Sequence, residues 1–282
     1  MAAKQEDHWD SAAYQNAASF VPKLATKVLQ WLDVQEDDVI LDVGCGDGVL
    51  DLQISPTFFK GTGCIHGIDS SESMIATANK SVSAYETPRM SHVCTFEVLD
   101  ATQLINSPAR QTSSFDKVFS NAAMHWILRP ETHRKAFFQG VRNALKPGGI
   151  FVFEMGGLGN VAEMRAALIS VVAKRVGIDR AREADPWFFP DERWMRGMLE
   201  ETVGGWKVER MEMEYRPTEA DQGGVGAWVR LMGKQFFDAV EDQAEREECE
   251  REVGEVLKTV CGRPGGGERI GYVRLRAVVR KI

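Results

Sequence analysis

The sequence predicts an α/β protein with a mostly parallel, doubly wound sheet. Short apolar runs alternate with stretches of helical spacing through the first half of the chain, the pattern of repeated strand–helix–strand units. The runs begin at Val39, Cys64, Cys94, Phe115 and Ile150. A glycine-rich loop follows the first run, and a polar residue lies at or just after the end of each of the next three. The carboxyl ends of parallel strands meet at one edge of a sheet, so we expect these polar residues to share one binding crevice.

The stretch VILDVGCGDG places glycines at 44, 46 and 48, shortly after Asp42. Glycine allows positive φ and lets a ligand approach the backbone closely. A loop of this kind at the end of a strand suits a nucleotide-like cofactor. The dinucleotide pattern G-x-G-x-x-G would need glycine where the chain has Val49, and no Gly-Lys-Ser/Thr of a phosphate-binding loop follows. Both of these nucleotide-binding patterns therefore fit poorly.

Three further polar residues follow in order along the predicted strands. Asp69 ends CIHGID, where a carboxylate can accept both hydroxyls of a ribose. Asp100 follows the third strand and Asn121 lies in the fourth. Any one of these residues could be an ordinary helix cap or turn residue. The ordered set, together with the glycine loop, is what predicts a cofactor site.

This D-x-G-x-G-x-G loop and the ordered set resemble the class I, Rossmann-like methyltransferases that use S-adenosylmethionine, over Val39 to about Glu154. The resemblance implies a seven-stranded sheet with helical lid insertions. Its last two strands, WKVERMEMEYRP and YVRLRAVVRK, would form an antiparallel hairpin at the edge. It also implies S-adenosylmethionine as cofactor, with Asp100 bonding the adenine amino group. The residues it assigns to the cofactor are Tyr14, Asp42, Gly44, Cys45, Gly46, Gly48, Asp69, Ser70, Met74, Leu99, Asp100, Ala101 and Asn121.

The segment SNAAMHWI, after the fourth strand, lies where this fold holds the acceptor. It lacks the Pro-Pro-Tyr/Phe of amine-methylating relatives and is most similar to the trans-aconitate methyltransferase group of small-molecule enzymes. The resemblance therefore implies O-methylation of a small carboxylic acid. His125 would bond a carboxylate oxygen, or act as a base for a hydroxyl or carbon acceptor. Two other interpretations stay open: His125 as a packing residue beside Trp126, and an inactive, methyltransferase-like binding module.

We expect one methyltransferase domain over residues 1–282. Its parts would be a helical lid (1–35), a cofactor-binding core (36–155), an inserted substrate lid (156–200) and a C-terminal part that completes the sheet (201–282). Aromatic residues cluster between prolines in the insertion and either line the acceptor site or form a small separate core. Arg193 could hold a second carboxylate as a bidentate pair. The residues expected at the acceptor are Trp126, Trp187, Arg193 and Trp194.

Composition excludes several other classes of function. The net charge of −7 disfavours a nucleic-acid partner. The five histidines and five cysteines show no metal-ligand spacing, so no metal is expected. The N-terminus has no signal-peptide pattern and no apolar run is long enough to span a membrane, which predicts a cytoplasmic protein. We expect a monomer or homodimer.

Overall fold

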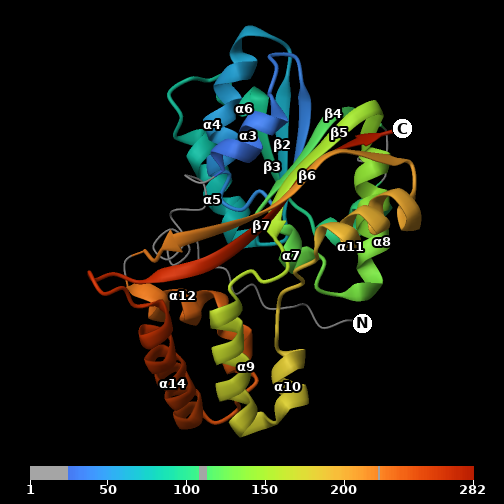
Figure 1. Ribbon diagram of the computed structural model, residues 1–282. Helices are drawn as coiled ribbons and strands as arrows, with labels where there is room; N and C mark the ends of the chain where they lie inside the picture. Colours follow the sequence, from blue (N-terminus) through green and yellow to red (C-terminus); the bar gives the residue numbers. More distant parts are fainter. Residues whose placement is uncertain (1–24, 108–112, 222) are drawn as a thin grey trace.

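The computed structural model describes residues 25–107, 113–221 and 223–282, whose strands form one seven-stranded sheet of order β3-β2-β1-β4-β5-β7-β6 (Figure 1). The strands are β1 (Val39–Val43), β2 (Cys64–Asp69), β3 (Cys94–Val98), β4 (Phe115–Asn121), β5 (Leu145–Gly156), β6 (Trp206–Glu219) and β7 (Arg269–Lys281). The pairs among β1 to β5 are parallel, and β7 runs antiparallel to both β5 and β6. The predicted fold and the antiparallel pairing of the last two strands are confirmed.

Apolar side chains cover both faces of the sheet, which explains the nearly continuous apolar runs of its strands. Ile40 of β1 points into one core and its neighbour Leu41 into the other. One face packs on α3 (Thr26–Leu32), α4 (Val49–Ile54), α6 (Met90–Val93) and the 3₁₀ helix η1 (Ser55–Lys60). The other packs on α8 (Glu131–Ala144), α11 (Glu192–Arg196), the 3₁₀ helix η2 (Ala101–Asn106) and the π-helix η4 (Gly197–Val203).

Helix α5 (Glu72–Ser83) follows β2 and begins at a serine cap. The Ser71 hydroxyl accepts the backbone N–H of Met74 at 3.2 Å and caps the helix. Met74, Ile75 and Ala78 form its buried face. This turn brings the end of β2 and the start of α5 to the edge of the sheet where the glycine loop lies.

A separate group of helices forms a lobe below the sheet in Figure 1. We call it the helical lobe: α9 (Ala162–Val176), α10 (Ile178–Glu183), α12 (Gly224–Met232), α13 (Lys234–Asp238) and α14 (Gln243–Cys261). Its members come from two stretches of the chain, one after β5 and one between β6 and β7. They share a core that includes Leu168, Phe236 and Val253. Tyr272 of β7 belongs to this core too, so the lobe packs on the end of the sheet.

Within the parts of the chain that the structure describes, no helix combines the length and the apolar character needed to cross a membrane.

Candidate active site

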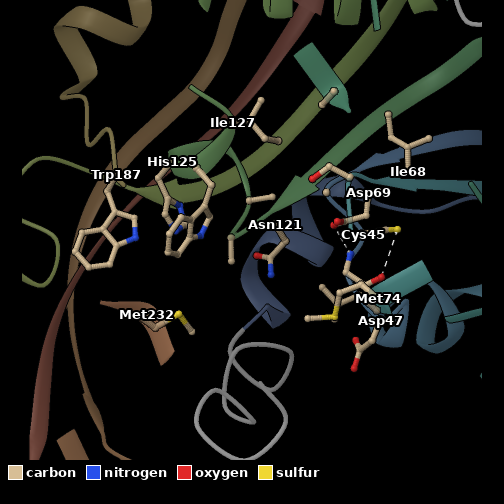
Figure 2. Close-up of a pocket in the computed structure, with 18 of the residues that line it drawn as sticks. Cys45, Asp47, Ile68, Asp69, Met74, Asn121, His125, Ile127, Trp187 and Met232 are labelled. Atoms are coloured by element: carbon tan, nitrogen blue, oxygen red, sulfur yellow. Dashed lines mark hydrogen bonds between the residues drawn. The ribbon is translucent and has the colours of Figure 1, made fainter. Parts of the chain in front are cut away.

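A pocket opens at the carboxyl ends of β1, β2 and β4 and continues between the sheet and the helical lobe (Figure 2). Its cofactor half is lined by Gly44, Cys45, Gly46, Asp47, Val49, Leu50, Ile68, Asp69, Ser70, Met74, Leu99, Asp100, Ala101, Asn121, Ala122, Ala123 and Ile127. Its acceptor half is lined by His125 and Trp126 of α7 (Met124–Ile127) together with Asn160, Val161, Trp187, Phe189, Trp228, Met232, Tyr272 and Arg274.

The three glycines of the loop have different roles, although all have left-handed φ angles of +76°, +58° and +73°. A Cβ on Gly44 would lie 2.2 Å from the Cβ of Ala123, and one on Gly48 would lie 2.4 Å from the ring of Phe96. A Cβ on Gly46 would meet nothing within 4 Å. Gly44 and Gly48 therefore allow close packing, whereas Gly46 leaves its backbone open to the pocket, as a cofactor cradle requires.

Asp69 is fixed by two backbone N–H groups at the mouth of this loop. Its Oδ2 accepts the N–H of Gly46 at 3.0 Å and its Oδ1 accepts the N–H of Ser71 at 2.9 Å. Each carboxylate oxygen can accept a second hydrogen bond. The arrangement therefore suits the two hydroxyls of a ribose. Asp100 also lines the pocket, and it caps η2 by accepting the N–H of Thr102 at 2.8 Å.

Asn121 lies between the two halves of the pocket (Figure 2). Its Oδ1 is buried, and it has no hydrogen-bond partner within the described ranges. A buried acceptor of this kind is costly unless a ligand supplies the donor. The amino group of S-adenosylmethionine is such a donor, so the residues present fit the expected cofactor.

Asp42 precedes the loop and does not line the pocket. It is buried, as is Asp51 of α4. Burial raises the pKa of Asp42 well above its usual value, and the neighbouring Asp51 raises it further. Burial also raises the pKa of Asp51 to about 7. These carboxyls form a buried acid pair under the cofactor loop, where two full negative charges would repel each other.

His125 is buried in the acceptor half, with 7% of its surface exposed. Its Nδ1 accepts the backbone N–H of Gly156 at 3.4 Å. Burial lowers the pKa of the imidazole well below its usual value, and the nearby Arg274 guanidinium lowers it further. The side chain is therefore a neutral imidazole at physiological pH.

Aromatic rings form the wall of the acceptor half. Trp187 packs against Trp126 with 5.6 Å between ring centroids, against Phe189 at 5.9 Å and against Trp228 at 6.0 Å. Trp126 and Trp187 thus lie at the pocket, as expected from the sequence. Arg193 and Trp194 do not. Arg193 is exposed on α11, and Trp194 packs edge-on against Phe188 with centroids 4.7 Å apart.

Not all residues that were expected to bind the cofactor are found in the pocket lining. Gly48 packs behind the loop against Phe96, outside the lining, and Tyr14 falls outside the described residues. The remaining expected cofactor residues line the pocket, with the exception of Asp42.

Part of the acceptor half was not expected from the sequence, chiefly Asn160, Trp228, Tyr272 and Arg274. Tyr272 and Arg274 alternate along the last strand and so share one face of it. This two-residue spacing was the sequence feature that could have placed both side chains on the same side of the sheet. Their proximity to the pocket depends on the pairing of β7 with β5, where Gly156 lies opposite Arg274.

Comparisons with known proteins agree with the fold and the expected cofactor. A family described as a methyltransferase domain matches residues 40–149. The chain is 35% identical over 280 residues to an uncharacterized methyltransferase of Schizosaccharomyces pombe, which covers 98% of this chain and 99% of that protein. It is 25% identical over 288 residues to trans-aconitate 2-methyltransferase of Variovorax paradoxus, which covers 97% and 98%.

A solved structure of a SAM-dependent methyltransferase from Methanosarcina mazei has the same fold, with a TM-score of 0.54 and 17% identity over 90% of this chain and 97% of that one. The chain belongs to the class I methyltransferases that use S-adenosylmethionine. The predicted family and cofactor are confirmed, and the trans-aconitate group is among the distant relatives.

Proposed function

We propose that this protein methylates a carboxylate oxygen of a small organic acid. The observation that carries the proposal is the hydrogen bond from the Gly156 N–H to Nδ1 of His125 at 3.4 Å. A backbone N–H only donates, so Nδ1 is the nitrogen without a hydrogen. In a neutral imidazole the hydrogen then lies on Nε2. His125 consequently offers the pocket a hydrogen-bond donor, and no basic nitrogen.

A donor at this position suits an acceptor that is already an anion. A carboxylate has lost its proton at neutral pH and needs no general base, whereas a hydroxyl or carbon acid does. Methyl transfer from a sulfonium then depends on holding the two reactants in line and on excluding water. The aromatic wall of the acceptor half covers one side of the reactants and supports both requirements. The full-length relative named for trans-aconitate acts on a carboxylic acid as well.

Product chemistry tests this proposal. The protein is incubated with methyl-labelled S-adenosylmethionine and a panel of organic acids and phenols. We expect label in products that release volatile methanol on mild alkaline treatment, as methyl esters do. Alkali-stable label, in an ether or a carbon-methylated product, would instead support the alternative with His125 as base. Cofactor binding without product from any acceptor would favour a binding module.

Variants of His125 separate the two roles of the imidazole. We expect His125→Ala to raise KM with a modest loss of kcat, and His125→Gln to recover part of the activity because its amide N–H also donates. A loss of several orders of magnitude in kcat would point to base catalysis. His133→Ala, an exposed histidine on α8, is the matched control.

A further inference from the structure

We infer that Arg274 binds the carboxylate of the acceptor, and that this acceptor has one carboxylate on a flat, apolar body. The inference rests on the proposed carboxylate methylation and adds the residue that recognises the acid and the shape of the molecule. Arg274 lies on β7, lines the acceptor half of the pocket, and is 4% exposed.

Within the part of the chain that the structure describes, the guanidinium of Arg274 forms a hydrogen bond through Nε but not through its terminal nitrogens. Its Nε donates to Oε1 of Glu154 at 2.9 Å. No hydrogen bond of its two terminal nitrogens occurs within the described ranges. These terminal nitrogens form the edge that pairs with a carboxylate through two parallel hydrogen bonds. A buried arginine with this edge unused is therefore prepared for an anionic ligand.

Glu154 keeps the arginine in place and is shared with two other arginines. It also accepts hydrogen bonds from Arg276 and Arg216, the latter at 3.3 Å. Burial opposes ionisation of Glu154, but Arg274, Arg216 and Arg276 outweigh it and hold the pKa of Glu154 below its usual value. One carboxylate thus serves several cations. Glu212 and Glu214 offset Arg276 on the far side, away from the pocket lining.

The number of cations limits the number of carboxylates in the acceptor. Among the described residues that line the pocket, Arg274 is the only lysine or arginine. A tricarboxylate such as trans-aconitate would leave two carboxylates without a charged partner against an aromatic wall, which is unfavourable. The lining of this half is instead largely aromatic, with Trp126, Trp187 and Phe189, and ring faces of this kind pack well against a flat apolar body.

The reaction balances with these groups alone. A carboxylate oxygen lone pair attacks the methyl carbon, and the C–O bond forms as the C–S bond breaks with its electron pair moving to sulfur. The sulfonium becomes a neutral thioether and the carboxylate becomes a neutral ester, and no proton is released. The ester no longer carries the charge that Arg274 binds. Arg274 consequently holds the acid more tightly than its methyl ester.

Calorimetry on protein saturated with S-adenosylhomocysteine tests the inference without turnover. The probes are trans-cinnamate, benzoate, cinnamamide and trans-aconitate. We expect at least one of the two aromatic acids to bind, the amide to bind weakly, and trans-aconitate to bind more weakly than the aromatic acid. Arg274→Met should weaken aromatic acid binding by at least about 30-fold and leave amide binding unchanged. Equal binding of the acid by Arg274→Met, or no binding of either aromatic acid to the unaltered protein, would overturn the inference.

Two controls guard against misfolding. Glu154 keeps Arg216 and Arg276 as partners in Arg274→Met, and retained affinity of this variant for S-adenosylhomocysteine shows that the cofactor half is intact. Arg280→Met is the matched control, because Arg280 lies on the same strand but pairs with Glu209 away from the pocket. If the acid binds through Arg274 but no ester forms, the proposed function is wrong and this inference stands. If an ester forms but Arg274→Met binds the acid as tightly as the unaltered protein, this inference is wrong and the proposed function stands.

Discussion

Trp228 donates its indole N–H to the hydroxyl of Tyr272 at 2.6 Å, and both side chains are buried. Trp228 belongs to α12 of the helical lobe and Tyr272 to β7 of the sheet. Both residues line the acceptor half of the pocket. This hydrogen bond therefore joins the two parts of the fold at the place where the acceptor half lies between them.

Removing the acceptor of that bond should destabilise the protein. Tyr272→Phe keeps the ring but leaves the Trp228 N–H buried without a partner, which we expect to cost about 1–3 kcal/mol of unfolding free energy in urea. The control is Tyr215→Phe on β6, since 68% of Tyr215 is exposed. Equal stability of the two variants would show that the bond contributes nothing measurable.

Alanine substitutions at two glycines should separate binding from folding. Gly46→Ala places its methyl group in open space, so it should cost only the left-handed backbone strain of roughly 1–2 kcal/mol while weakening cofactor binding. Gly48→Ala adds a collision with the Phe96 ring and should lower Tm further. Thermal unfolding and calorimetry with S-adenosylhomocysteine check both effects. Unchanged affinity in Gly46→Ala would contradict the position of the cofactor.

Asp69 should contribute directly to cofactor affinity. Asp69→Ala removes the carboxylate that faces the expected ribose, and we expect binding of S-adenosylmethionine to weaken by about 1–3 kcal/mol. Asp191→Ala is a matched control, since Asp191 also accepts a backbone N–H, that of Trp194 at 2.7 Å, but lies outside the pocket lining. If both variants bind the cofactor equally well, Asp69 has no role in holding it.

The cofactor half could be predicted because its residues follow local rules. Each of its strands ends in a loop whose residues come next in the sequence, so Gly46, Asp69 and Asp100 reach the pocket through their own β–α turns. Asp42 departs from this local pattern. It comes two residues before the loop, but its side chain turns beneath the loop to face Asp51.

The acceptor half depends on contacts between distant parts of the chain. Arg274 reaches the pocket because β7 lies between β5 and β6 and pairs with β5 in a particular register. No local sequence pattern specifies this strand order or this register. The aromatic residues of the insertion also lie in two different places. Trp187 turns into the pocket, whereas Trp194 packs beside the sheet core with Phe188. Aromatic residues only seven positions apart therefore have different surroundings, and composition alone cannot distinguish them.

The buried pair under the loop should make stability fall as pH rises. Asp51 has a pKa of about 7 in the folded protein against 3.8 as its ordinary value, so the folded state binds more protons than the unfolded state between these limits. Its contribution is complete below the lower value and is lost as pH rises through about 7. We expect Asp51→Asn, which cannot ionise, to flatten the decline of unfolding free energy between about pH 4 and pH 7. Asp37→Asn is the control, because hydrogen bonds from Thr62 lower the pKa of this exposed carboxyl and its titration lies below that range. Urea unfolding across the pH series measures both slopes, and a slope in Asp51→Asn as steep as that of the unaltered protein would rule out the raised pKa.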